Sequence, residues 1–145
     1  KEPSCAAKIA EYINQEIKPL IGATLDMRMV ERAKFFFAKK QYLKALILLY
    51  EGLIIAIGRK HGFGSGLDYG EREKIRQFIN DNESTVFSNV EQRKTYTDLK
   101  WTRNAAVHGS RSQGTQNYIE NEEQFRMLFN QALELYKHVI GDKLC

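Results

Sequence analysis

From Tyr42 to Lys60 the sequence is apolar on nearly every side of a helix. Only Glu51 and Gly52 interrupt the longest apolar run, which extends from Ala45 to Ile57. A helix without a polar face is either buried at the centre of a fold or bound to another chain. The run is too short to cross a hydrocarbon layer of about 30 Å. The sequence therefore predicts a helix that is either central in the fold or part of an interface with another chain, and no membrane span.

Apolar residues at helical spacing recur on both sides of this segment, and no useful length of sequence alternates with the period of two that marks a strand. Residues that cap helix starts precede three predicted helices: Ser4, Thr24 and Asn121. Residues that end helices follow three of them: Pro19, Gly109 and Gly141. The predicted fold is an all-α bundle of five or six helices in one domain.

Three connections separate the middle helices. Residues 39–41 form a short link, which implies that the helices on either side are antiparallel neighbours. Residues 61–70 hold four glycines but lack the strand and the Gly-Lys-Ser/Thr of a phosphate-binding loop, so we interpret them as a connection. Residues 81–89 are predicted to be polar turn, between a short charged helix over residues 69–80 and a longer one over residues 90–108.

Composition bounds the setting of the chain. Cys5 and Cys145 form neither a disulfide framework nor a zinc pattern, so we expect a reducing, cytoplasmic environment. His61 and His138 lack nearby ligand partners; we interpret both as non-catalytic and expect no metal or cofactor. Because the chain begins with Lys, we expect residues 1–145 to be a domain excised from a longer protein. The net charge of +4 permits binding to a polyanion without requiring it.

The tightest group of chemically capable side chains is Arg103, Asn104 and His108, near the predicted end of a helix. Arginine offers phosphate oxygens a fork of donors, and histidine transfers protons near neutral pH. Arginine and histidine near a helix end also occur simply as favourable charges at the C-terminus. The residue types alone favour that structural interpretation.

The run from Arg103 to His108, Arg-Asn-Ala-Ala-Val-His, resembles the signature of the HEPN superfamily. Ribonuclease members of this superfamily carry Arg, then a polar residue, then His after a short gap. The helix count and order also resemble HEPN domains, in which the motif ends one long helix and another follows. The resemblance implies a metal-independent endoribonuclease acting on single-stranded RNA, with Arg103, Asn104 and His108 as catalytic residues. The implied products carry a 2′,3′-cyclic phosphate or a 3′-phosphate, and a 5′-hydroxyl.

The spacing of the motif raises a geometric question. Five residues of an ideal helix turn the chain through about 500°, so Arg103 and His108 point about 140° apart. Either His108 lies in the terminating turn and swings towards Arg103, or a second chain completes the pocket. The HEPN resemblance implies the second arrangement, a homodimer whose two motifs form one composite site.

Lys100, Trp101 and Arg111 are candidate substrate-binding residues beside the motif. Lys100 and Arg111 help to make its neighbourhood basic, which suits a phosphate backbone. Trp101 could stack on a base beside His108. A lone tryptophan among apolar residues is more often part of a core, however, and we expect packing to be the main role of Trp101 and of Tyr96.

Within the superfamily, the apolar third helix, the apparent excision and the Arg-Asn-x3-His form look most like the effector domains of CRISPR-associated antiviral proteins. That resemblance implies an N-terminal sensor domain that binds cyclic oligoadenylate. Two alternatives remain open. One is a HEPN toxin paired with a nucleotidyltransferase-like antitoxin, and the other is a non-catalytic helical dimerisation module.

Overall fold

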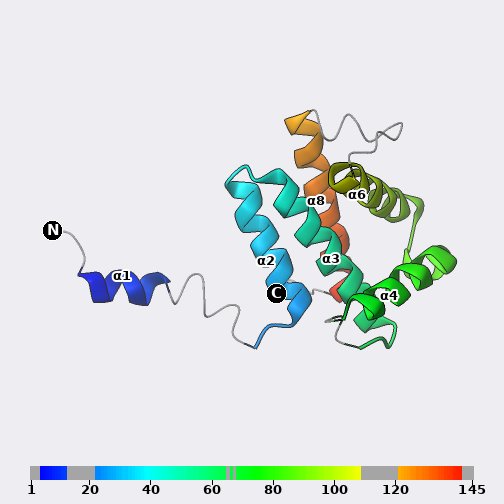
Figure 1. The fold of residues 1–145 in the computed structure, drawn as a ribbon, viewed down its shortest axis with the longest axis horizontal. Helices are drawn as coiled ribbons and strands as arrows, with labels where there is room; N and C mark the ends of the chain where they lie inside the picture. Colours follow the sequence, from blue (N-terminus) through cyan, green and yellow to red (C-terminus); the bar gives the residue numbers. More distant parts are fainter. Residues whose placement is uncertain (1–3, 13–21, 65, 67, 109–120, 142–145) are drawn as a thin grey trace.

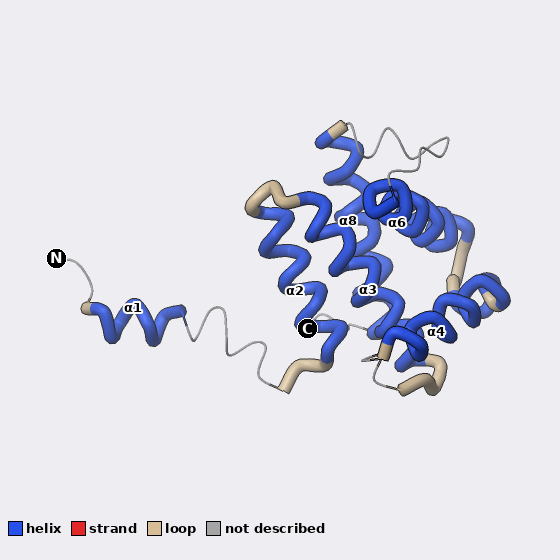
Figure 2. The backbone as a smooth tube through the Cα atoms, viewed as in Figure 1, coloured by secondary structure: helices blue, strands red, loops and turns tan. Residues whose placement is uncertain are grey.

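The computed structural model describes residues 4–12, 22–64, 66, 68–108 and 121–141, and of Tyr12 and His108 it describes the backbone alone. Every regular element in these ranges is a helix, which confirms the all-α prediction (Figure 2). The described ranges hold seven helices rather than five or six. They are α1 (Cys5–Tyr12), α2 (Leu25–Ala38), α3 (Tyr42–Lys60), α4 (Tyr69–Asp81), α5 (Glu83–Val86), α6 (Val90–His108) and α8 (Glu122–Ile140).

The apolar helix α3 is the centre of the bundle, which is the first of the two alternatives that its sequence left open. It contacts α2, α4, α6 and α8, and these four helices surround it (Figure 1). Its side chains supply the largest share of the core, with Leu49, Leu53 and Ile54 fully buried. α2 lies alongside α3 in the antiparallel direction, which confirms the prediction from the short link between them.

Gly52 brings α2 and α3 close together. A Cβ atom added at Gly52 would lie 3.0 Å from Cγ2 of Val30 and 3.3 Å from the backbone oxygen of Asp26. Such distances are tighter than ordinary van der Waals contact, so a side chain at this position would push the helices apart. The interruption of the apolar run at Gly52 therefore serves the packing of the helix pair.

Asp26 ties three helices together from a buried position. Its carboxylate accepts hydrogen bonds of 2.5 and 3.1 Å from the guanidinium of Arg59 on α3, and one of 2.8 Å from the phenol of Tyr136 on α8. Burial on its own favours the neutral carboxyl, but hydrogen bonds from Thr24, Tyr136 and Arg59 outweigh it, so the pKa of Asp26 is lowered. Asp26 is therefore a charged side chain on α2 that joins this helix to α3 and α8 through hydrogen bonds.

The described helix ends follow the predicted caps. Ser4 Oγ accepts a hydrogen bond of 3.2 Å from the amide of Ala7, and Asn121 Oδ1 accepts one of 3.1 Å from the amide of Gln124. Gly141 ends α8 with a φ of 67°, in the left-handed region that glycine tolerates. Thr24 occupies the N-cap of α2 without a side-chain bond to that helix's amides. The predicted terminators Pro19 and Gly109 lie outside the described residues.

The segment predicted as polar turn, residues 81–89, instead contains α5. That prediction was wrong because the segment contains two neighbouring apolar residues that pack into the core. Val86 and Phe87 are buried, and the Phe87 ring lies 5.0 Å from the ring of Tyr96 on α6. Burial of these two side chains draws the segment against the bundle. A single helical turn then provides hydrogen bonds for its backbone N–H and C=O groups.

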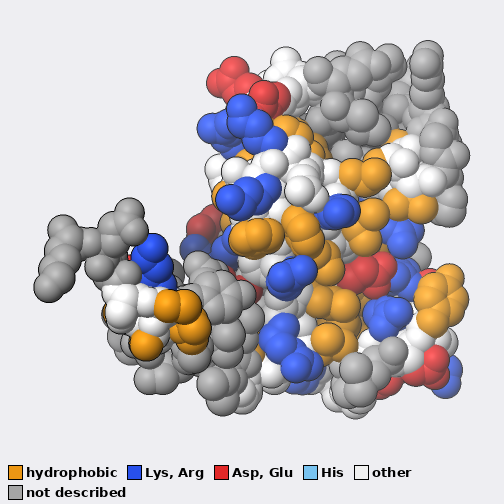
Figure 3. Space-filling view, turned by 60° about the vertical axis from the view of Figure 1, so that its left-hand side comes forward, with side chains coloured by type: hydrophobic (Ala, Val, Ile, Leu, Met, Phe, Trp, Pro, Cys, Tyr) orange, Lys and Arg blue, Asp and Glu red, His pale blue; other side chains and the backbone are white. Residues whose placement is uncertain are grey.

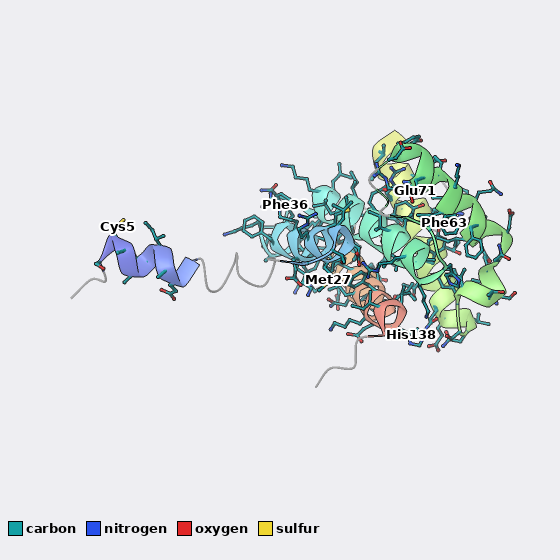
Figure 4. The ribbon with its side chains drawn as sticks, turned by 90° about the horizontal axis from the view of Figure 1, so that it is seen from below. Cys5, Met27, Phe36, Phe63, Glu71 and His138 are labelled. Atoms are coloured by element: carbon teal, nitrogen blue, oxygen red, sulfur yellow. The ribbon has the colours of Figure 1, made fainter. Side chains whose placement is uncertain are left out.

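The α2 side and the α4 side of the bundle lie opposite each other (Figure 4). On the face that includes α2, hydrophobic and basic side chains are interspersed (Figure 3). There the guanidinium of Arg32 lies 5.1 Å from the ring of Phe36, and Lys44 lies 5.3 Å from it. Glu71 on α4 and Phe63 in the connection before it lie on the opposite side of the molecule from Phe36 (Figure 4). Four of the predicted site residues, Lys100, Trp101, Arg103 and Asn104, face the α4 side.

Candidate functional site

A pocket of about 310 Å³ opens between α3, α4 and α6. Four of the predicted site residues line it, all from α6: Lys100, Trp101, Arg103 and Asn104. The rest of the lining comes from α3 and α4: Tyr50, Tyr69, Glu73, Arg76, Gln77 and Asn80. The structure thus places two of the three predicted catalytic residues in one concave site.

The inward face of α6 holds these residues in place. Tyr96, Leu99, Thr102 and Ala105 recur every three residues and are all buried. This stripe packs α6 against α3 and α8. The prediction that Tyr96 packs is confirmed. Four residues between the stripe positions lie at the edge of the core and reach the pocket: Lys100, Trp101, Arg103 and Asn104.

The carboxylate of Glu51 lies among three arginines. Its Oε1 is 2.5 Å from Nη2 of Arg76 and 3.5 Å from Nη2 of Arg103, and its Oε2 is 3.3 Å from Nε of Arg72. Only 13% of the Glu51 side chain is exposed, so water screens these attractions less than it does on an open surface. The central helix thus supplies a fixed negative charge that holds the motif arginine beside an arginine of α4.

The ring of Tyr50 forms the apolar support for the same two guanidinium groups. The guanidinium carbon of Arg103 lies 5.5 Å from the ring centroid, and that of Arg76 lies 5.8 Å from it. Cations at this range are attracted by the ring's electrons. Burial raises the pKa of Tyr50, so the phenol stays neutral and adds no charge to the site.

Two asparagines present their amides to the pocket. Asn104 Oδ1 accepts a hydrogen bond of 3.1 Å from Arg103, and Asn80 Oδ1 accepts one of 3.3 Å from Lys100. Because arginine and lysine can only donate, these bonds fix which end of each amide faces the cation. The amide NH₂ groups are then available to donate. The pocket therefore offers more donors than acceptors.

Trp101 is half-exposed, with 47% of its surface accessible, so the prediction that it packs in the core was wrong. Its position on α6 explains the difference. Leu99 and Thr102 occupy the buried stripe on either side of it, and the next residue in that stripe is Ala105. Trp101 instead lines the pocket, with the Lys100 ammonium 5.2 Å from its ring. This position agrees with the alternative use considered for Trp101, in which its ring contacts the substrate.

The other predicted residues are described only in part. α6 remains helical through His108, its last residue, so the helix includes both ends of the motif. The side chain of His108 and the whole of Arg111 lie outside the described residues. In a helix that includes both positions, Arg103 and His108 are about 140° apart around the axis.

Sequence reasoning missed Arg76 and the role of Glu51. Glu51 carried a signal, because it is the lone carboxylate in the apolar run of α3 and a buried charge needs a partner. Arg76 carried none, since it is one of several charged residues on a short polar helix. Only the packing of α4 against α3 shows that Arg76 both pairs with Glu51 and lines the pocket.

The charges of the pocket favour an anion. Three cations line it, Arg76, Lys100 and Arg103, against one carboxylate, Glu73. Burial tends to lower the pKa of Arg76, but the neighbouring groups, Glu51 first among them, together outweigh burial, so the net shift is upward and the guanidinium stays charged. Aromatic rings beside a basic groove are typical of single-strand binding sites.

A second pocket, of about 530 Å³, lies between the start of α6 and the end of α8. It is lined largely by amide side chains and holds His138, whose Nε2 is 3.1 Å from Oγ of Ser88. None of the predicted site residues lines it.

Across the part of the chain that the structure describes, no three His, Cys, Asp or Glu side chains are grouped to hold a metal ion. No described helix has the length and apolarity to span a bilayer.

No family model matches the chain, and neither a curated protein nor a solved structure matches it. What can be inferred about its activity therefore depends on the motif and on the pocket that contains it.

Proposed function

We propose that this chain is a metal-independent endoribonuclease of the HEPN type that cleaves single-stranded RNA. The observation that carries the proposal is the pocket. Arg103 and Asn104 of the motif line it together with further cations and with two exposed aromatic rings, those of Tyr69 and Trp101. Cations that bind phosphates and rings that stack on bases are the two components of a single-strand site.

The proposed reaction is a transfer of phosphorus from one ribose oxygen to another. A base takes the proton of the 2′-hydroxyl, and the 2′-oxygen forms a bond to phosphorus. The bond from phosphorus to the 5′-oxygen breaks, and an acid gives that oxygen a proton. The products are a 2′,3′-cyclic phosphate and a 5′-hydroxyl.

Each motif residue has a role that its chemistry allows. Arg103 binds the non-bridging phosphate oxygens, whose charge is most crowded in the transition state. Asn104, already bonded to Arg103, orients the guanidinium or the phosphate. His108 moves a proton as base or acid, an effect worth about 10²–10⁴ in rate.

We propose that the active form is a homodimer. Because α6 includes both Arg103 and His108, the two positions diverge around its axis. Two copies whose α6 ends meet would let the histidine of one chain act beside the arginine of the other. In this proposal the nuclease is a cytoplasmic, CRISPR-associated antiviral effector, and a sensor domain for cyclic oligoadenylate regulates it. The Arg-Asn-x3-His spacing and the apolar central helix support that placement.

The test is cleavage of a labelled single-stranded RNA in EDTA by the wild type, Arg103→Ala and His108→Ala, over a range of protein concentrations. Arg126→Ala is the matched control, because Arg126 lies on α8 with a 57% exposed side chain and outside the pocket. We expect both motif variants to lose at least about 10²-fold of the rate and the control to keep it. A rate that rises faster than linearly with protein supports the dimer. Cleavage that persists in both motif variants would show that another protein or another site cuts the RNA.

A further inference from the structure

Two guanidinium groups from different helices meet at a single carboxylate oxygen. Arg76 of α4 and Arg103 of α6 both place Nη2 against Oε1 of Glu51, at 2.5 and 3.5 Å. Both also lie against the ring of Tyr50. Two groups that share one oxygen atom are close enough to bind one phosphate group together.

The surroundings fix these groups in advance of binding. Tyr50 is buried, Glu51 is nearly so, and both belong to the rigid central helix. The Arg76 side chain is 15% exposed and that of Arg103 is 22% exposed, yet both line the pocket. A guanidinium held in place loses little freedom when it binds an anion, which increases its affinity.

Arg72 shows what an arginine of purely structural role looks like in the same place. It lies one turn before Arg76 on α4 and pairs with the other oxygen of Glu51. It also donates a hydrogen bond of 2.6 Å to the backbone oxygen of Gly66, and it does not line the pocket. Arg72 thus attaches the connection before α4 to the bundle, whereas Arg76 faces the space where a ligand fits.

Glu73 marks the position that a ligand would take. Its carboxylate pairs with Nη1 of Arg76, lines the pocket and has a side chain that is 49% exposed. An incoming phosphate can displace an exposed carboxylate easily, because water solvates it once it is released. Glu51, with 13% exposure, stays in place as the counter-charge behind both arginines.

We infer that Arg76 is a second substrate-binding residue, which together with Arg103 clamps one phosphodiester of a single-stranded RNA. This inference rests on the proposed function for its substrate class. The clamp is built from residues 27 positions apart, and only one of them belongs to the motif. Glu73 competes with the phosphate for Arg76 and so lowers the affinity of the free site for RNA.

The experiment measures equilibrium binding of a fluorescent single-stranded RNA in which every 2′-hydroxyl is replaced by fluorine, so that the strand cannot be cleaved. Fluorescence anisotropy is recorded at several salt concentrations for the wild type, Arg76→Ala, Arg72→Ala and Glu73→Gln. The logarithm of the affinity falls linearly with the logarithm of salt concentration, with a slope of about −0.7 for each phosphate contact to a single strand.

We expect Arg76→Ala to weaken binding at least about tenfold and to reduce the magnitude of the salt slope by about 0.7. Arg72→Ala loses the same partner, Glu51, but should leave the slope unchanged. Glu73→Gln should tighten binding, and since Glu73 is half-exposed this variant tests the clamp without risk to the fold. An unchanged slope in Arg76→Ala, an equal loss in Arg72→Ala, or no gain in Glu73→Gln each overturns the inference.

Failure of the clamp and failure of the nuclease can be told apart, because binding of this probe requires no chemistry. A chain that binds with the expected slopes but never cleaves RNA keeps the clamp and loses the nuclease. A chain that cleaves RNA through Arg103 and His108 while Arg76→Ala binds normally keeps the nuclease and loses the clamp. A wild type that does not bind the probe overturns the clamp.

Discussion

Asp26 accepts a hydrogen bond of 2.8 Å from the phenol of Tyr136, which lies 110 residues further along the chain. The same carboxylate pairs with Arg59, so one buried group joins α2, α3 and α8. We expect Asp26→Asn to destabilise the fold by about 2–4 kcal/mol, because it leaves polar groups without their charged partner. Urea unfolding at pH 7 measures the loss. Glu31→Gln, on the exposed side of α2, is the control and should change stability by less than about 0.5 kcal/mol.

The same pair has a pH signature. The pKa of Asp26 is lowered in the folded state, so its stabilising contribution is complete above the unfolded pKa of about 3.9. The contribution is lost as the pH falls through the lower, folded pKa. The difference in unfolding free energy between wild type and Asp26→Asn should therefore be constant from pH 5 to 7 and shrink below about pH 4. A difference that grows on acidification would contradict this account of Asp26.

Gly52→Ala tests the close contact between α2 and α3. Alanine in a helix is better than glycine by about 1 kcal/mol. Here its methyl group meets Val30 and the backbone of Asp26, and overpacking costs about 1–3 kcal/mol. We expect a net loss of stability. Gly70→Ala in α4 meets nothing closer than 3.5 Å and should be neutral or stabilising. Thermal unfolding of the two variants shows whether the steric cost at position 52 exceeds the gain in helix propensity that alanine brings.

Glu51→Gln separates binding from positioning. Removing the negative charge makes the pocket more basic, which offsets the freedom that the two arginines regain, so RNA should bind at least as tightly as before. Arg103 loses the carboxylate that holds it in place, and a misplacement of about 1 Å can cost about 10²-fold in rate. We expect kcat to fall at least about tenfold while KM stays equal or falls. Steady-state cleavage kinetics give both constants. A rise in KM with an unchanged kcat would show that Glu51 acts on binding alone.

Trp101→Ala should weaken binding of single-stranded RNA without unfolding the protein. Stacking of a base on an aromatic ring is worth about 1–3 kcal/mol, which corresponds to about 5–150-fold in affinity. The side chain is half-exposed, so its removal creates no internal cavity. Leu99→Ala, two residues earlier and fully buried, should instead lower stability by about 2–5 kcal/mol. Anisotropy and urea unfolding, measured on both variants, should give opposite results.

Local patterns predicted the helices well. The apolar segment from Tyr42 to Lys60 predicted α3 with both of its ends. A helix that is apolar on every side must be covered by other helices or by another chain. The caps at Ser4 and Asn121 and the terminator Gly141 act within one turn of their own position, so sequence alone identifies them.

Contacts between segments that are distant in the chain could not be predicted from the sequence. A tryptophan among apolar residues suggests a core position. The buried stripe of α6 sets the orientation of this helix about its own axis, and only that orientation turns the Trp101 ring outwards. Arg76 and Arg103 are brought together by a carboxylate that is distant from both in the chain. Helical spacing relates residues three or four positions apart, and it does not show which helices become neighbours.

Trp101 is the sole tryptophan of the chain, and it lies on the rim of the pocket with a lysine beside its ring. The tryptophan fluorescence of the protein therefore comes from one indole at one known place. Occupancy of the pocket can be followed through the intensity and colour of that emission, without any attached dye. The natural sequence thus carries a built-in optical reporter of the site.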